Sequence, residues 1–356
     1  MYLYNDLRIC CDWLEFTIQE KSPYVVCEKL GFASDLFRKM DRGSMGYSGM
    51  LRHKSAEITI LYNGNDDMGV HVQVKGSAVS YFLEMFKNTL KSKDLTPWMT
   101  EVYEYDDFDD IDNLIRVLFI KVRSAGWFSR IDLAIDDVGA NYYTCKKVHD
   151  VLKSGNYVSK IKKWQADVTC NRQGDITGYT VYLGSARNSR MFLRVYDKRL
   201  EQLAKKGKTE LPDWVRWEIV LKDERAENFA AYIVNNMDFS VATASVLNSL
   251  VRFVKNDSCN KSLCTTKSKW KKFVGAVEKI KLTSLPGGKS VQKSYDWICR
   301  QCAPTLAGLT AAFGGDMSFI TKNLSEHFER LSAKDKEMFL NYLKEGVSDD
   351  DDRGLY

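Results

Sequence analysis

The sequence is poor in the features that mark several large classes of protein. Its 356 residues include five prolines and four histidines, and no apolar run is long enough to cross a bilayer. So few prolines argue against long disordered linkers, and we find no repeat of fixed period and no low-complexity stretch. The N-terminus carries no signal-peptide pattern, so we expect a soluble, cytoplasmic protein without membrane association.

Cysteine is present, but not in the patterns that build disulfide frameworks or zinc sites. There are nine cysteines, an odd number, which without a secretory leader predicts reduced thiols. Cys299 and Cys302 form a C-x-x-C pair, yet neither a second pair nor a histidine cluster completes a zinc site. We interpret this pair as two small apolar residues on a helix.

Basic residues are unevenly placed along the chain. The formal charge of +5 is a weak signal, but ten lysines and only two acidic residues lie between Lys255 and Lys293. Such a segment attracts phosphate backbones. A solvated, lysine-rich helix face is the alternative interpretation.

The apolar pattern of the first two-thirds predicts an α+β fold. Helical spacing indicates helices over residues 77–92 and 110–125. After about Asp223 we expect only helices. We therefore predict a catalytic domain over residues 1–257 and a helical C-terminal region over 258–356 that binds DNA or a partner. Alternating apolar residues predict strands over 7–18, 57–62, 70–75, 130–136 and 214–222, and a hairpin over 177–198.

Three of these predicted strands carry ionisable side chains on the face opposite their apolar residues. Because strands alternate faces with a period of two, the ionisable groups share one surface if the strands are neighbours. These groups are Asp132, Asp136, Arg194, Tyr196, Lys198, Arg216 and Glu218.

Clustered carboxylates with a tyrosine nearby are a pattern that suits phosphoryl chemistry. Carboxylates repel one another unless a cation neutralises them, and their hard oxygens suit Mg²⁺ or Mn²⁺. Arg, Lys and metal charge near a tyrosine favour its phenolate, which can attack phosphorus. The alternative is an ordinary solvated sheet face. Composition alone leaves rival tyrosines, of which Tyr182 in the same hairpin is the strongest; the others are Tyr142, Tyr143 and Tyr179.

Five short motifs follow one another along the chain. They are Asp12-Trp13-Leu14, Arg130 to Asp136, Thr180 to Ser185, Arg194-Val195-Tyr196-Asp197-Lys198 and Arg216-Trp217-Glu218. This order resembles the replication-initiation-factor family, often called Rep_trans. That family includes initiators of staphylococcal rolling-circle plasmids and relaxases of integrative and conjugative elements. The C-terminal Trp270-Lys271-Lys272-Phe273 and Trp297 to Leu309 resemble the conjugative-element branch.

The resemblance implies a metal-dependent DNA endonuclease and strand transferase, with an antiparallel sheet covered by helices on one face. Tyr196 matches the family's nucleophile, and Asp132 and Glu218 fall in its acidic motifs as metal ligands, with Asp136 a third candidate. The related superfamily has a His-hydrophobic-His motif that this sequence lacks. His71-Val72-Gln73 is the nearest approach, and we leave open whether His71 contributes to a metal site or is a solvated edge position.

The implied reaction is a transesterification that leaves a 3′-OH and a 5′-phosphotyrosine. Arg194 and Lys198 are expected to assist Tyr196. Phe192 or Trp214, on the same predicted face, could stack an unpaired base or pack at the sheet edge. The residues expected to contact DNA are Arg130, Arg190, Arg216, Lys269, Trp270, Lys271 and Lys272.

The expected partners are duplex and single-stranded DNA at an origin of replication or of transfer, with a host helicase. The sequence leaves a homodimer open. The main alternative is an initiator that binds the origin and recruits the helicase without cutting DNA.

Overall fold

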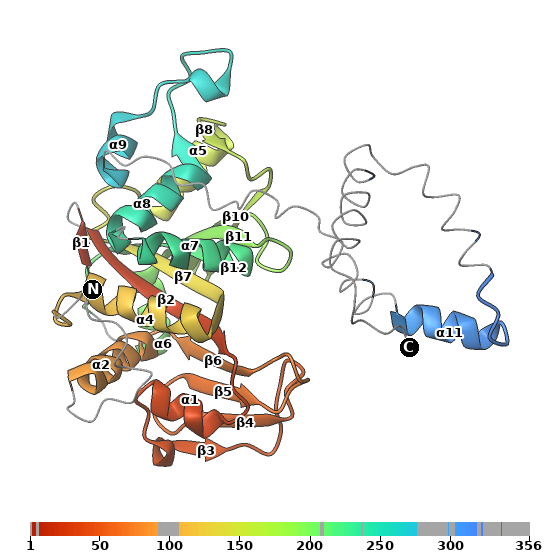
Figure 1. Cartoon of the computed structure of the whole chain (residues 1–356). Helices are drawn as coiled ribbons and strands as arrows, with labels where there is room; N and C mark the ends of the chain where they lie inside the picture. Colours follow the sequence, from red (N-terminus) through yellow and green to blue (C-terminus); the bar gives the residue numbers. More distant parts are fainter. Residues whose placement is uncertain are drawn as a thin grey trace. The chain divides into compact units, whose positions relative to one another are not determined.

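The protein is built on one large antiparallel sheet, seen in the computed structural model (Figure 1). The structure describes residues 2–4, 7–91, 107–206, 210–235, 238–275 and 303–318, with positions 298, 322 and 336. The strands of the sheet are β1 (Tyr2–Tyr4), β2 (Leu7–Ile18), β3 (Phe37–Lys39), β4 (Gly49–His53), β5 (Ile58–Tyr62), β6 (Val70–Lys75), β7 (Gly126–Val138), β9 (Trp164–Cys170), β10 (Ile176–Leu183), β11 (Met191–Asp197) and β12 (Trp214–Lys222).

The strand order places the first long strand in the middle of the sheet. It runs β3-β4-β5-β6-β2-β7-β12-β11-β10-β9, with β1 paired to β2. Every neighbouring pair is antiparallel. Two short strands, β8 (Tyr157–Ser159) and β13 (Val251–Phe253), form a separate pair.

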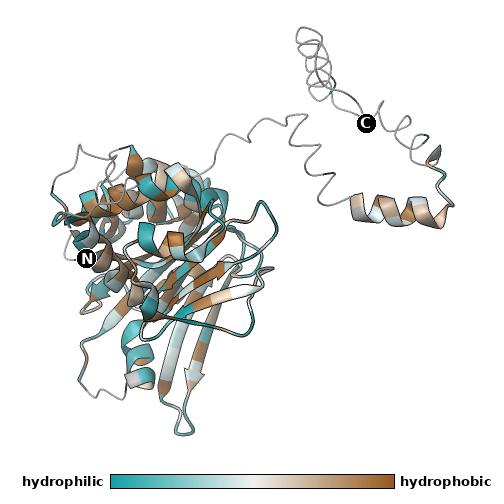
Figure 2. Cartoon of the chain, turned by 60° about the horizontal axis from the view of Figure 1, so that its bottom comes forward, coloured by the Kyte–Doolittle hydropathy of each residue, from teal (hydrophilic) through white to brown (hydrophobic). Residues whose placement is uncertain are grey.

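Helices cover the apolar face of the sheet. Phe119 of α4 packs on Phe128 of β7 at 4.6 Å between ring centroids, and Phe82 of α2 stacks on Phe16 of β2. Hydrophobic and hydrophilic bands alternate along the strands, so the opposite face is polar (Figure 2). The helices are α1 (Pro23–Lys29), α2 (Ala78–Lys91), α4 (Ile111–Ala125), α5 (Cys145–Lys153), α6 (Lys198–Lys206), α7 (Glu224–Val234), α8 (Phe239–Leu250), α9 (Ser268–Val274) and α11 (Ala303–Ala312).

The expected α+β class and antiparallel sheet are confirmed. α6 is an exception to the expected one-sided cover, because its first residue, Lys198, reaches the polar face. The expectation that no strand follows Asp223 was wrong, since β13 pairs with β8. β9 and α5 were not anticipated.

The expected domain boundary after Asp257 differs from the structure, in which one compact unit runs to Thr283. Trp217 of β12 packs in an aromatic cluster with Trp270 and Phe273 of α9, at centroid distances of 5.7 and 5.0 Å. α9 is therefore part of the core of the first unit. Ending the chain at Asp257 would remove two fully buried rings from that core.

The second compact unit, residues 284–356, is described mainly at α11 and the turn that follows it. Leu309, Phe313 and Met317 are exposed there. Cys299 and Cys302 lie outside the described residues, while the seven cysteines that the structure does describe are all free thiols. No helix within the described ranges has the length and apolarity needed to cross a membrane.

Candidate active site

Two adjacent strands place the expected nucleophile beside a carboxylate. In the register of β11 with β12, Arg194 lies opposite Glu218 and Tyr196 lies opposite Arg216. Residues directly opposite in antiparallel strands point to the same face. The expected juxtaposition of these four side chains is confirmed.

The neighbouring strand β7 adds two more carboxylates to this face. Glu218 lies opposite Ala134, which is flanked on its own face by Asp132 and Asp136. All three carboxylate residues are almost fully buried, with 0 to 2% of their surface exposed. Because these carboxylates are shielded from solvent, this part of the face is a charged interior rather than a solvated surface.

Tyr196 stands at the centre of a hydrogen-bonded group. Its hydroxyl donates to Glu218 Oε2 at 3.2 Å, and Lys198 Nζ donates to the phenol oxygen at 3.4 Å. Arg194 Nη2 donates to Glu218 Oε1, so both oxygens of this carboxylate have partners. We refer to Tyr196, Glu218, Arg194 and Lys198 as the Tyr196 cluster.

The environment of Tyr196 favours its neutral form. Burial raises the pKa of Tyr196 well above its usual value of about 10, and the charge of Glu218 raises it further, against the opposing charge of Arg216. The expectation that basic neighbours favour the phenolate was therefore wrong for the protein alone. The phenol proton must pass to a base, and Glu218 is the carboxylate in contact with it.

Lys198 is held beside Tyr196 by a helix contact. It opens α6, and its Nζ pairs with Glu201 Oε2 at 2.5 Å, one turn along the helix. Burial would raise the pKa of Glu201, but hydrogen bonds from Lys198 and Lys205 outweigh it and lower that pKa to about 2. Glu201 is thus ionised and fixes the Lys198 ammonium next to the phenol.

Asp132 is engaged by a single arginine. Arg130 Nε and Nη2 donate to its two oxygens at 2.8 and 2.7 Å. Burial raises the pKa of Asp132 to about 7, opposed by Arg130 and reinforced by the charge of Glu218. The Arg130 guanidinium also lies 3.8 Å from the centroid of the Trp13 ring, while 21% of its side chain stays exposed.

Asp136 has a different environment. Arg216 binds both of its oxygens at 2.6 and 2.8 Å and donates a third hydrogen bond to Asp12 at 2.6 Å. Only 8% of the Arg216 side chain is exposed. We refer to Asp12, Asp136 and Arg216 as the Arg216 cluster. Asp136 and Arg216 are thus bound to each other, and a metal ion on Asp136 or a DNA phosphate on Arg216 would have to displace this pairing.

Sequence reasoning missed a carboxylate on β2. Glu15 accepts a hydrogen bond from Trp13 Nε1 at 2.7 Å, and its Oε2 lies 3.6 Å from His71 Nε2. His71 is buried and also contacts Thr17, so the interpretation of it as a solvated edge position was wrong. The alternation of Trp13, Glu15 and Thr17 opposite the apolar residues of β2 was a signal for this polar row.

Three of the four rival tyrosines have their contacts outside the Tyr196 cluster. Tyr142 and Tyr143 are buried against the aromatic rings of α9. The Tyr179 hydroxyl is hydrogen-bonded to His149 at 2.7 Å. Tyr182 is half-buried and lies opposite Arg194, on the same face as Tyr196.

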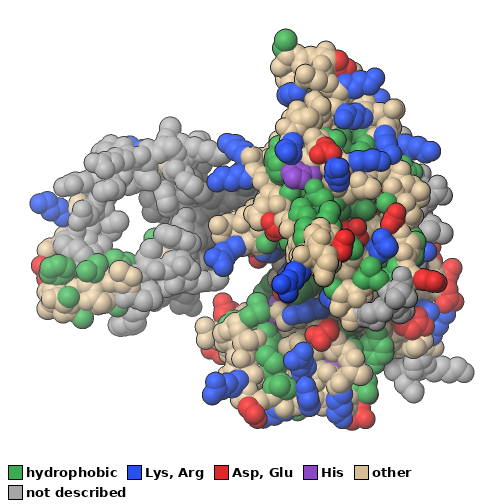
Figure 3. Space-filling view, turned by 180° about the vertical axis from the view of Figure 1, so that it is seen from behind, with side chains coloured by type: hydrophobic (Ala, Val, Ile, Leu, Met, Phe, Trp, Pro, Cys, Tyr) green, Lys and Arg blue, Asp and Glu red, His purple; other side chains and the backbone are tan. Residues whose placement is uncertain are grey.

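A pocket of about 310 Å³ opens beside the Tyr196 cluster. Tyr196, Arg194, Tyr182 and Thr180 line it from the sheet, and Glu201 lines it from α6. The phenol of Tyr196 is therefore next to a space that a substrate group can enter. Figure 3 shows the side of the molecule opposite α4 and α7, where Lys and Arg side chains border a hollow near the middle.

The residues expected to contact DNA fall into two groups. Arg190 is well exposed, with contacts to Glu224 at 3.3 Å and to Asp223 at 4.0 Å, and Lys269, Lys271 and Lys272 are exposed on α9. Trp270 is fully buried, and its Nε1 donates to Asn248 at 3.2 Å. The expectation that Trp270 contacts DNA was therefore wrong.

No group of three or more His, Cys, Asp or Glu side chains converges as a metal cage in the part of the chain that the structure describes. The carboxylates point to arginines or to Tyr196 instead. Asp132 and Glu218 are the two whose partner arginines are partly exposed, at 21% and 34% of the side chain.

Comparisons with known proteins agree with this architecture. The profile of the family described as replication initiation factor matches residues 126–324, and that of the rolling circle replication initiation protein N-terminal domain matches residues 8–94. The chain is 29% identical over 287 residues to the putative DNA relaxase NicK of Bacillus subtilis, covering 79% of this chain and 74% of that protein. The fold matches that of the rolling circle replication initiator protein from Geobacillus stearothermophilus with a TM-score of 0.61 and 24% identity, over 78% of this chain and 98% of the other.

Proposed function

The chain belongs to the replication initiation factor family, and from this premise we propose that it is an origin-specific nickase that cuts one DNA strand through Tyr196. The observation that carries the proposal is the hydrogen bond from the Tyr196 hydroxyl to Glu218, flanked by two cations and opening on a pocket. A nucleophile within hydrogen-bond reach of a base, and oriented by further groups, is the arrangement that covalent catalysis requires.

The proposed reaction is a transesterification at one phosphodiester. Glu218 Oε2 accepts the phenol proton, and the Tyr196 oxygen forms a bond to phosphorus. The bond between phosphorus and the 3′ oxygen breaks, and this oxygen leaves with the electron pair and takes up a proton from solvent. The products are a free 3′-OH and a 5′-phosphotyrosine, which the reverse reaction can rejoin.

Arg194 and Lys198 have distinct roles in this scheme. Lys198 donates to the phenol oxygen and can stabilise the negative charge that develops there as the proton leaves. Arg194 has about a third of its side chain exposed and is free to turn from Glu218 to a DNA phosphate. Arginine binds phosphate oxygens in a bidentate manner, which would position the strand.

We propose Asp132 and Glu218 as the protein ligands of a divalent cation, Mg²⁺ or Mn²⁺. Magnesium sites of this type use one or two carboxylates with substrate phosphates, so two carboxylates diagonal to each other on β7 and β12 fit the donor set. Asp136 fits less well, because the arginine that binds both of its oxygens, Arg216, is only 8% exposed, whereas the Arg130 partner of Asp132 is 21% exposed. A cation bound there would supply positive charge to stabilise the phosphorane-like transition state.

The substrate is proposed to be duplex DNA at an origin of replication or transfer, with an unpaired strand at the cut. Replication and conjugative transfer begin with the same nick, and the relatives include a replication initiator and a putative relaxase. A host helicase as partner and a cytoplasmic location complete the proposal, which leaves a homodimer open. An initiator that only binds its origin would need no tyrosine hydroxyl in contact with a buried carboxylate.

Supercoiled plasmid carrying the cognate origin tests this function. With Mg²⁺ or Mn²⁺, the protein should convert it to open circles and remain covalently attached to DNA. Tyr196→Phe should abolish both the nick and the adduct while DNA binding is kept. Tyr182→Phe is the matched control and should keep the adduct, whereas a covalent complex formed by Tyr196→Phe would refute the assignment.

A further inference from the structure

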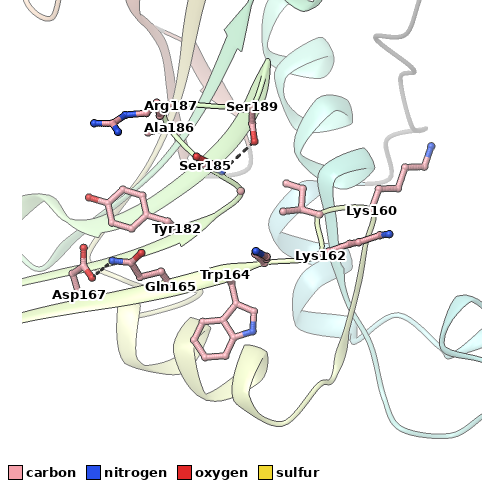
Figure 4. A pocket seen from close by; sticks show the side chains of 13 residues that line it. Lys160, Lys162, Trp164, Gln165, Asp167, Tyr182, Ser185, Ala186, Arg187 and Ser189 are labelled. Carbon is pink, nitrogen blue, oxygen red and sulfur yellow. Dashed lines mark hydrogen bonds between the residues drawn. The ribbon is translucent and has the colours of Figure 1, made fainter.

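A broad groove lies beside the proposed active site. It has a volume of about 880 Å³ and is bordered by the link between β8 and β9, by β9 and β10 and by the turn between β10 and β11. Figure 4 shows Lys160 and Lys162 extending from the link, Arg187 at the turn, and Tyr182 and Gln165 projecting from the strands.

The rim of this groove is basic. Lys160, Lys162, Lys163 and Arg187 line it and are all exposed. None of these four forms an ion pair with a carboxylate among the described residues. Asp167 is the one acidic residue of the lining, and it accepts a hydrogen bond from Gln165. The groove therefore presents unneutralised positive charge, which suits a polyanion.

The groove leads to Tyr196 through Tyr182. The Tyr182 ring lines both this groove and the smaller pocket beside Tyr196. In the strand register it lies between Gln165 of β9 and Arg194 of β11, the residue that binds Glu218. A chain that occupies the groove and passes Tyr182 thus arrives at the nucleophile.

We propose that this groove binds the unpaired DNA strand next to the scissile phosphate, with its phosphates on the lysines and Arg187 and one base stacked on Tyr182. The inference rests on the proposed nickase function, because it takes its occupant from that substrate. Basic grooves with an aromatic platform bind single strands without needing a particular sequence, since every base has a face to stack. The continuous path to Tyr196 favours the cut strand as the occupant.

Equilibrium binding of full-length protein to fluorescent oligothymidylate tests the groove without cutting, in a Tyr196→Phe background. Replacing Lys160, Lys162 and Lys163 by Gln together should weaken binding and reduce the slope of log affinity against log salt by about 2, since each phosphate contact to a single strand contributes about 0.7. The matched control replaces three exposed lysines of α5, Lys146, Lys147 and Lys153, and should bind as the parent does.

The stacking contact has its own test. Tyr182→Ala should weaken binding roughly 5- to 150-fold, the range for loss of one stacked base, while Tyr182→Phe keeps the ring and the affinity. Thermal melting of each variant shows that it is folded. An unchanged affinity and salt slope in the triple lysine variant, or a loss confined to duplex DNA of the same length, overturns the proposal. If the groove variants lose binding while the parent fails to nick its origin, the groove stands and the nickase function falls.

Discussion

The Tyr196 cluster and the Arg216 cluster occupy the same face of β7, β11 and β12, yet their carboxylates are paired in different ways. Arg216 is nearly inaccessible and saturates Asp136 with two hydrogen bonds while it holds Asp12 with a third. Glu218 instead divides its oxygens between a partly exposed arginine and a tyrosine hydroxyl.

This difference suits the Arg216 cluster to stabilising the fold and the Tyr196 cluster to the proposed reaction. A buried ion pair with every hydrogen bond made is costly to break, so it fixes strands but has nothing left to offer a substrate. In the proposed reaction Glu218 instead takes up the phenol proton, and the partly exposed Arg194 turns from Glu218 to a DNA phosphate. The clusters should therefore respond in opposite ways to mutation.

The largest effect is expected from Glu218→Gln. This change keeps the shape of the side chain but removes the proposed base for the Tyr196 proton, so nicking should fall on the order of 10²- to 10⁴-fold. Arg194 is partly exposed and can be solvated, so the melting temperature should change little. Plasmid nicking and thermal melting measure the two quantities, and near-parental nicking would remove Glu218 from the mechanism.

Arg216→Met should invert this pattern. It leaves the Asp136 carboxylate buried without a partner, which should lower the free energy of unfolding by about 3–5 kcal/mol. Nicking per folded molecule should fall less than in Glu218→Gln. A double variant, Asp136→Leu with Arg216→Met, removes both charges and should regain much of the lost stability in urea unfolding. A stable but inactive single variant would place Arg216 in the catalytic machinery.

Asp132→Asn tests a residue that shares features with both clusters. Asp132 is buried, as Asp136 is, but its partner Arg130 is partly exposed, as Arg194 is beside Glu218. If Asp132 is a metal ligand, its loss should cut nicking about 100-fold, since charge stabilisation of several kcal/mol is at stake. EDTA should abolish nicking by the parent protein. Full activity of Asp132→Asn and Glu218→Gln in excess EDTA would exclude a catalytic cation at these residues.

The smallest effect is expected at exposed cations that belong to neither cluster. Replacing Lys271 and Lys272 of α9 by Gln should leave melting and nicking chemistry unchanged, because both side chains are exposed. If both lysines contact phosphates, the slope of log affinity for duplex DNA against log salt concentration should become shallower by about 2. An unchanged slope would show that this part of α9 does not face DNA.

The sequence predicted the faces of the strands well, because alternation depends on local geometry alone. It placed Asp132, Glu218 and Tyr196 on one surface before their neighbours were known, and the register confirmed it. It could not predict that this surface is buried, nor that Asp136 and Arg216 satisfy each other, since these depend on pairing between residues 80 positions apart.

Trp270 shows a different kind of failure. Its lysine neighbours suggested a DNA-binding segment, but Trp270, Phe273 and Val274 have the spacing of one helix face and are all buried. The lysines on one side of α9 drew attention away from the apolar residues on its other side. β9 was not predicted because most of its residues are exposed, so apolar and polar residues alternate little along it.

The central position of β2 has a consequence for how the protein is made. β2 is synthesised well before one of its partners, β7, which begins more than a hundred residues later. The sheet and the Tyr196 face are not complete until β12 has emerged. Long-range pairings of this kind form late, since the intervening loop must be closed before its contacts stabilise it. A nascent chain shorter than about the first two-thirds therefore lacks β12, which carries Glu218, and cannot form the Tyr196 cluster.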